Sequence, residues 1–212
     1  DEQEEQERRD FVKCLPFENC IQLEHAANEK TTMQFSNVYA AGSSQALVYQ
    51  GVCSHLISET LEGKDSCIVV AGSRAMGKSF SLLGIIGDVV DMGLVERFIT
   101  KVFESGENAR EAMRVIVQVM VTGKNNEADL FDRRCLVDDS LKLHEFSAVL
   151  SHKTAENLKE LGALLRKVQT SLRGHPSEDW IMQLSFEKVK DFSSKRFLSK
   201  VTFVEIQARG DL

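Results

Sequence analysis

The spacing of apolar residues changes several times along the chain, and each change predicts a different element. Residues 43–63 place Val48, Val52 and Leu56 on one helical stripe, and the stretch ends at Gly63. Serines stand where they could cap the start. We therefore expect a single helix of about five turns over this range.

Other stretches have the patterns of strands. Residues 67–71 (CIVVA) form a continuous β-branched run, which is typical of a strand covered on both faces. Weaker alternation in residues 11–39 also suggests strands joined by turns. The remaining predictions are strands at 112–123, 179–189 and 197–207, two helical stretches within 79–105, a turn at 127–132 that leads into a short element, and a helix at 152–172. Because helices and strands alternate, we expect an α/β three-layer domain.

Composition fits one globular domain with an acidic leader. The chain has 212 residues, of which 42% are hydrophobic, and only two prolines, so it can bury a core. Residues 1–10 (DEQEEQERRD) contain no apolar side chain and cannot bury surface. We predict a disordered leader at 1–10 and one domain at 11–212.

Charge and hydropathy exclude several function classes. The net charge of −6 and the lack of a basic block argue against nucleic-acid binding. No apolar run approaches the roughly 20 residues of a membrane-spanning helix, and the first residues are acidic where a secretory signal would be basic. We expect a cytoplasmic protein without a membrane span.

The five cysteines and five histidines are scattered without metal-ligand spacing, so reduced thiols and no metal site among them are expected.

The clearest chemical signal is a phosphate loop. Residues 72–79 (GSRAMGKS) match G-x-x-x-x-G-K-[ST] and lie between a predicted strand and a predicted helix. In such a loop backbone N–H groups surround phosphates, Lys78 reaches the outer phosphates, and the Ser79 hydroxyl binds magnesium. The alternative is a glycine-rich turn that only caps a helix, with Lys78 exposed. The candidate nucleotide-binding residues are Gly72, Ser73, Arg74, Ala75, Met76, Gly77, Lys78 and Ser79, with Ser79 also the candidate metal ligand.

The order of short motifs around this loop strongly resembles the kinesin motor domain, over roughly residues 32–210. The matching features are Phe35 with Val38-Tyr39, Ser44-Gln45, Val48-Tyr49, Leu61-Glu62-Gly63, the strand at 67–71, the phosphate loop, and residues 83–86. The resemblance implies a P-loop NTPase of kinesin motor type, with a central mixed sheet and helices on both faces. It also implies ATP or ADP with Mg as cofactors, microtubules (tubulin) as partner, a cytoskeletal location, and a protein cargo or regulator.

The chain departs from the kinesin pattern at the segments that sense nucleotide. Kinesins have an Arg-x-Arg-Pro on the first strand, without a counterpart here. Their switch I reads Ser-Ser-Arg-Ser-His, whereas residues 176–180 place Glu178 at the arginine and Asp179 at the second of its flanking serines. Their switch II reads Asp-Leu-Ala-Gly-Ser-Glu, whereas residues 205–210 keep a carboxylate at Glu205 and put Ala208 at the glycine. Glu205 is therefore the candidate catalytic residue of a degenerate switch II, and Glu178 and Arg209 could form a reversed ion pair.

Three hypotheses follow. The chain is an ATP-binding kinesin-like domain with slow or lost hydrolysis, because switch groups act in the transition state. Alternatively, it is a non-catalytic scaffold or regulator that binds microtubules or partners without turnover. An unrelated phosphate-loop kinase or GTPase would need a base-recognition motif that we do not find. For Trp180 we expect a place in the core at a strand edge, or a static plug near the nucleotide.

Overall fold

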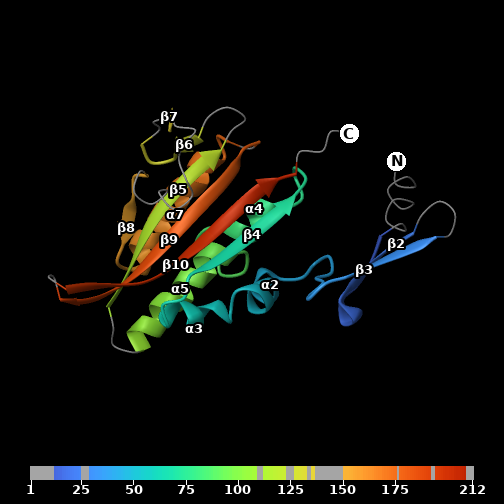
Figure 1. The fold of residues 1–212 in the computed structure, drawn as a ribbon, viewed down its shortest axis with the longest axis horizontal. Helices are drawn as coiled ribbons and strands as arrows, with labels where there is room; N and C mark the ends of the chain where they lie inside the picture. Colours follow the sequence, from blue (N-terminus) through green and yellow to red (C-terminus); the bar gives the residue numbers. More distant parts are fainter. Residues whose placement is uncertain are drawn as a thin grey trace.

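A computed structural model describes residues 12–24, 29–108, 112–122, 127–132, 135–136, 150–175, 177–191 and 194–208 (Figure 1). The predicted leader at 1–10 lies outside these residues. The elements in chain order are β1 (Val12–Leu15), the 3-10 helix η1 (Pro16–Glu18), β2 (Cys20–Glu24), β3 (Lys30–Gln34), α2 (Gln45–Val52), α3 (Leu56–Leu61), β4 (Ser66–Gly72), α4 (Lys78–Leu83), α5 (Leu94–Asn108), β5 (Ala112–Thr122), β6 (Glu127–Asp129), β7 (Cys135–Leu136), β8 (Lys153–Ala155), α7 (Leu158–Leu172), β9 (Asp179–Asp191) and β10 (Ser194–Gln207).

The strands form two sheets. A three-stranded antiparallel sheet, β1-β2-β3, lies apart from the larger body in Figure 1. The seven-stranded sheet has the order β4-β10-β9-β5-β6-β7, with β8 paired to β5. Its β4 and β10 are parallel, and its other pairs are antiparallel. The predicted mixed central sheet is therefore confirmed.

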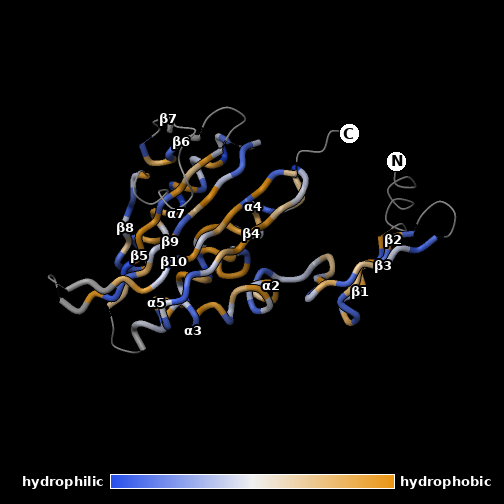
Figure 2. The backbone as a smooth tube through the Cα atoms, in the orientation of Figure 1, coloured by the Kyte–Doolittle hydropathy of each residue, from blue (hydrophilic) through white to orange (hydrophobic). Residues whose placement is uncertain are grey.

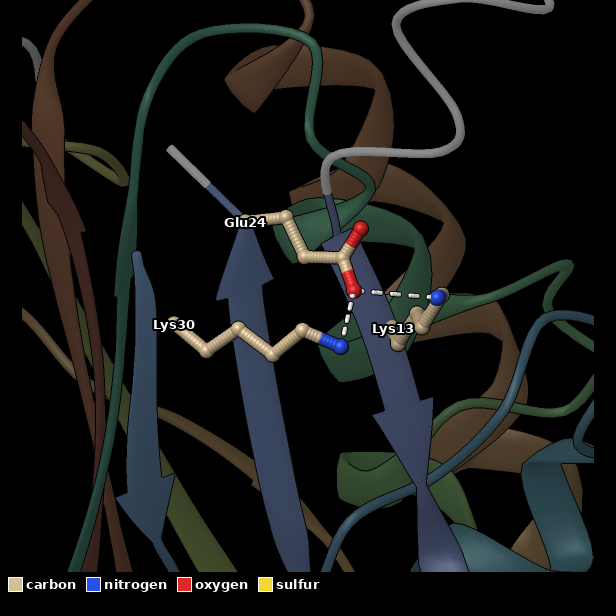
Figure 3. A network of polar contacts seen from close by, with 3 residues as sticks. All are labelled: Lys13, Glu24 and Lys30. Atoms are coloured by element: carbon tan, nitrogen blue, oxygen red, sulfur yellow. Dashed lines mark hydrogen bonds and ion pairs between the residues drawn. The ribbon is translucent and has the colours of Figure 1, made fainter. Parts of the chain in front are cut away.

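The small sheet is held partly by exposed charges. The Glu24 carboxylate accepts hydrogen bonds from Lys30 Nζ at 2.8 Å and from Lys13 Nζ at 3.1 Å, so one residue of β2 joins both neighbouring strands (Figure 3). Surface ion pairs of this kind contribute little each to stability. They do favour one register of the three strands.

The main core lies between one face of the larger sheet and the helices. The Phe98 ring of α5 packs edge-on against Phe186 of β9 and Phe203 of β10, at 6.1 and 6.0 Å between ring centroids. Buried residues of α4, α5 and α7 belong to the same continuous core as the alternate residues of β9. Figure 2 shows hydrophobic and hydrophilic stretches alternating along these strands. The described helices pack on this one face, and helices on the other face are not among the described elements.

The helix predicted over 43–63 is divided into two. Ser44 caps α2 as expected, with its Oγ accepting from the Leu47 N–H at 3.2 Å. The chain then turns at residues 53–55 before α3 begins, and Cys53 is fully buried at this turn. Both short helices contact α5, and the turn at the buried Cys53 separates them. The prediction of one continuous helix was wrong for this reason.

The helix predicted over 152–172 begins later than expected. Residues 153–155 form β8 instead and pair with Val115, Ile116 and Val117 of β5. Asn157 then caps α7, because its side chain accepts from the Glu160 N–H at 2.9 Å. Two helices in 79–105 and strands at 67–71, 112–123, 179–189 and 197–207 are confirmed to within a few residues.

The connection between α4 and α5 is tightly bonded. Gly84 and Met92 form an isolated antiparallel bridge. Arg97 of α5 donates from Nε to the Met92 carbonyl and from Nη2 to the carbonyls of Val89 and Val90, at 2.8, 2.8 and 2.9 Å. This anchored loop fixes where α4 ends, and therefore where the phosphate-loop candidate lies relative to the sheet.

Candidate functional site

The predicted phosphate loop lies between strand β4 and helix α4, as the sequence indicated, although β4 is an edge strand of the described sheet. β4 ends at Gly72 and α4 begins at Lys78. Gly77 has a φ of +78° and Ala75 a φ of +63°, both in the left-handed region. Glycine adopts that region freely, whereas alanine there costs about 1 kcal/mol. Left-handed residues in a loop turn successive N–H groups toward one side, which is how backbone forms an anion-binding concavity.

Lys78 is buried at the start of α4, with 6% of its surface exposed. Its Nζ donates to the Ser73 carbonyl at 2.6 Å and to Gln207 Oε1 at 2.9 Å. The alternative in which Lys78 is simply an exposed side chain is therefore wrong. The amino group is directed across its own loop and toward the end of β10.

Glu205 lies at the centre of the polar cluster and is 1% exposed. Its Oε1 accepts from Ser79 Oγ at 2.8 Å and from Gln207 Nε2 at 3.0 Å, and its Oε2 accepts from Trp180 Nε1 at 2.9 Å. A buried carboxylate is costly unless it is hydrogen-bonded, and here both oxygens have donors. The cluster thus joins α4, β9 and β10.

The two segments that resemble the switches are also bonded to each other and to the loop. Asp179 Oδ1 accepts from the Gln207 N–H at 2.6 Å, and the Ala208 N–H donates to the Gly72 carbonyl at 2.9 Å. Glu178 Oε2 lies 2.9 Å from His175 Nδ1. Arg209 lies outside the described residues, so the reversed pair between Glu178 and Arg209 stays a prediction.

Clefts open on two sides of Glu205. One of about 290 Å³ is lined by residues 74–80, Glu205 and Gln207. The other, of about 360 Å³, lies between the end of α4 and the end of α7, and its walls include Leu83, Leu172 and Trp180. Ser79, Phe80, Glu205 and Gln207 border both clefts. The candidate site is therefore a groove beside the phosphate loop.

The donor set suits a magnesium-bound phosphate group. Hydroxyl and carboxylate oxygens are ligands that Mg²⁺ prefers, and Ser79 Oγ and Glu205 Oε1 already meet at hydrogen-bond distance. The buried Lys78 amino group supplies the positive charge that phosphate needs. These residues would hold the two groups, provided that Glu205 and Lys78 exchange some of their present partners.

Other candidate chemistry is not found in the described part of the chain. No group of three or more His, Cys, Asp or Glu residues there could hold a metal ion. The described cysteines, Cys14, Cys20, Cys53 and Cys67, are free thiols, which confirms that prediction for these four. Among the described helices none is long and apolar enough to cross a membrane.

Comparison with known proteins identifies the family. The family model described as Kinesin motor domain matches residues 1–176. This chain belongs to the kinesin motor domain family. The matched range includes the phosphate loop at 72–79 and ends before Trp180 and Glu205, in the part where the sequence departs from the kinesin switch pattern.

Several kinesins are similar to this chain at low identity. Kinesin-related protein 2 of Dictyostelium discoideum is 31% identical over 86 residues, which cover 41% of this chain and 11% of that protein. Kinesin heavy chain of Caenorhabditis elegans is 25% identical over 144 residues, 67% of this chain and 17% of the relative. Kinesin-related protein 3 of Dictyostelium discoideum is 29% identical over 141 residues, 64% and 12% respectively. The chain therefore corresponds to a small part of each relative's length.

Sequence reasoning missed two features of this kinesin-type site. It recognised Gln207 only as part of the switch II segment, and it did not connect Trp180 with Glu205. Strand alternation could have placed Glu205 and Gln207 on one face, but their partners depend on how β10 pairs with β4 and β9. Residues 203, 205 and 207 of β10 share one face, and the parallel pairing with β4 places Gln207 opposite Gly72.

Proposed function

We propose that this chain is a microtubule-associated, kinesin-like domain that binds ATP or ADP with Mg at Gly72–Ser79 and hydrolyses ATP slowly or not at all. The observation that supports this best is the convergence of Lys78, Ser79 and Glu205 in one buried polar cluster. Chance glycine-rich turns do not place a buried lysine, a hydroxyl and a carboxylate together.

Each residue has a proposed role. The N–H groups of residues 72–79 would bind phosphate oxygens, and Lys78 would neutralise their charge. Ser79 and Glu205 would hold the metal, with Glu205 at the position of the kinesin switch II aspartate. When bound, Mg²⁺ supplies charge neutralisation and orientation of the phosphates. The protein's own contribution is to bind, orient and partly exclude water.

Three contacts support weak hydrolysis. The Ala208 N–H, which by its position would meet the terminal phosphate, donates to the Gly72 carbonyl. The Glu178 side chain, at the position of the switch I arginine, contacts His175. Both Glu205 oxygens already accept hydrogen bonds. Removing a single donor aimed at developing charge typically slows a reaction by about 10²- to 10³-fold, so these changes together favour low turnover.

The same contacts favour a second candidate function. Gln207 accepts a hydrogen bond from Lys78 and donates one to Glu205, so both charged groups have hydrogen-bond partners within the chain itself. This supports a non-catalytic scaffold or regulator, located in the cytoplasm on the cytoskeleton, that binds microtubules or partner proteins without nucleotide turnover.

Calorimetric titration with ATP and with ADP, in Mg²⁺ and in excess chelator, separates the two candidates. Micromolar, Mg-dependent binding that Lys78→Ala abolishes and the exposed Lys159→Ala retains would support a nucleotide site. Unchanged affinity in Lys78→Ala would refute the placement of the phosphates. Co-sedimentation with microtubules, with and without nucleotide, then tests the scaffold function. No association with microtubules in either condition would contradict microtubule binding by this chain.

A further inference from the structure

The Gln207 side chain bridges the two ionic groups of the site. Its Oε1 accepts from Lys78 Nζ at 2.9 Å, and its Nε2 donates to Glu205 Oε1 at 3.0 Å. The orientation of the amide matches the charges on either side, since the oxygen faces the ammonium group and the NH₂ faces the carboxylate. A bridge of this kind requires a side chain with both a donor and an acceptor.

The fold holds Gln207 in place for this contact. The Gln207 N–H donates to Asp179 Oδ1 at 2.6 Å, which ties its backbone to the start of β9. The parallel register sets Gln207 beside Gly72, the first residue of the phosphate loop. One residue further, the Ala208 N–H continues this pairing to the Gly72 carbonyl. The backbone of Gln207 is therefore held by β4 and β9, which places its side chain beside Lys78.

We propose that Gln207 is an internal competitor for phosphate at Lys78, and that a nucleotide must displace it to bind. The proposal rests on the proposed nucleotide site and specifies how that site is regulated. Lys78 has two described acceptors, Gln207 Oε1 and the Ser73 carbonyl. A phosphate oxygen that takes the place of the amide breaks the Lys78–Gln207 bond, and a metal ion that takes Glu205 Oε1 also displaces the Gln207 Nε2 donor from that oxygen.

The consequence is a site of lowered but adjustable affinity. A hydrogen bond to a charged group is stronger than a neutral one, and its loss on binding subtracts from the affinity gained. Only the fraction of molecules with Lys78 released is ready for phosphate, which reduces the apparent affinity by that fraction. Removing the amide should therefore strengthen nucleotide binding, the opposite of what loss of an ordinary binding residue does.

The test compares MgADP and MgATP binding in the unaltered chain, in Gln207→Ala and in Gln207→Leu, by calorimetry. Gln207→Leu keeps most of the side-chain volume, so a packing defect in the alanine variant would be recognised. Gln50→Ala, at an exposed position on α2, is the matched control. Trp180, the one tryptophan of the sequence, donates to Glu205, so its emission reports the same titrations independently.

The expected result is a Kd about tenfold lower in both Gln207 variants and unchanged in Gln50→Ala. The double variant Gln207→Ala with Lys78→Ala should bind no better than Lys78→Ala alone, because the competitor acts through that amino group. Equal or weaker binding in the Gln207 variants, with the unaltered chain binding normally, overturns the competitor but leaves the nucleotide site standing. A gain that persists without Lys78 also overturns it. Absence of binding in every variant overturns both proposals.

Discussion

Trp180 Nε1 and Glu205 Oε2 are joined by a hydrogen bond of 2.9 Å, and the two side chains are 3% and 1% exposed. Trp180 stands at the start of β9 and Glu205 near the end of β10, and the two residues face each other in the antiparallel register. The segments that occupy the switch I and switch II positions of a kinesin are thus connected directly through their side chains. Trp180 is both a core residue, as the sequence suggested, and a neighbour of the candidate site.

Trp180→Phe should lower the free energy of unfolding by about 1–3 kcal/mol in addition to the packing energy lost with the smaller ring. The reason is that a buried Glu205 carboxylate oxygen loses its hydrogen-bond donor. Urea unfolding measures this. In a Glu205→Ala background the hydrogen-bond part of the loss should disappear, leaving only packing. An equal loss in both backgrounds would mean that the hydrogen bond contributes nothing measurable.

Gly84→Ala should destabilise the protein by about 2 kcal/mol or more. Gly84 has a φ of +58°, and an added Cβ would collide with the carbonyl oxygen of Asp91 across the α4–α5 connection. Gly42→Ala is the control, since Gly42 has a φ of +84° but nothing within 4 Å of the added atom. It should cost only about 1 kcal/mol, the backbone part alone. Thermal unfolding that shifts equally in both variants would contradict the clash.

Cys53 should resist alkylation in the folded protein. Burial raises the pKa of its thiol to about 12, so almost no reactive thiolate is present at pH 8. Cys14 and Cys67 are exposed and should react first. Iodoacetamide labelling followed by peptide mass spectrometry measures each site separately, with urea-unfolded protein as the control in which Cys53 also reacts. Rapid labelling of Cys53 without denaturant would show that α2 and α3 do not cover it.

Glu24 should titrate below its ordinary value. Hydrogen bonds from Lys30 and then Lys13 hold the pKa of this carboxyl below 4.5. Because the folded state favours the charged form, the small stabilisation is complete above pH 4.5 and is lost as the pH falls through the lowered pKa. Lys30→Ala should move the pKa upward, measured from the side-chain carboxyl ¹³C shift by NMR. Lys64→Ala, whose partner is Glu62, should leave it unchanged, and an unshifted Glu24 in both variants would contradict the contact.

The elements that the sequence predicted best are those whose signal is local. The β-branched run at 67–71 predicted a strand and the glycine pattern at 72–79 a tight loop, because both signals are local. The expectation that this strand is covered on both faces was wrong, since β4 is an edge strand with Val69 55% exposed. The break between α2 and α3 at Cys53 could not be predicted from local sequence in this way. It depends on how two short helices meet α5, a tertiary contact that the stripe of Val48, Val52 and Leu56 does not encode.

The start of α7 was predictable only in part. Asn157 followed by Glu160 is a recognisable capping pattern, and it could have placed the helix start correctly. The pairing of residues 153–155 with β5 could not have been foreseen, since three residues have no period of their own. In the candidate site, residue types were predictable and partners were not: the contact between Gln207 and Lys78 joins positions 129 residues apart.

The sheet face opposite the helices affects the handling of this chain in solution. Val69 of β4 is 55% exposed and Ile206 of β10 is 40% exposed, and Val204 pairs with Val69 in the parallel register. Apolar side chains from two neighbouring strands therefore form one water-facing surface. Such surfaces tend to adhere to one another. We expect concentrated samples of this chain to self-associate, and a lysine at position 69 to raise its solubility without touching the phosphate loop.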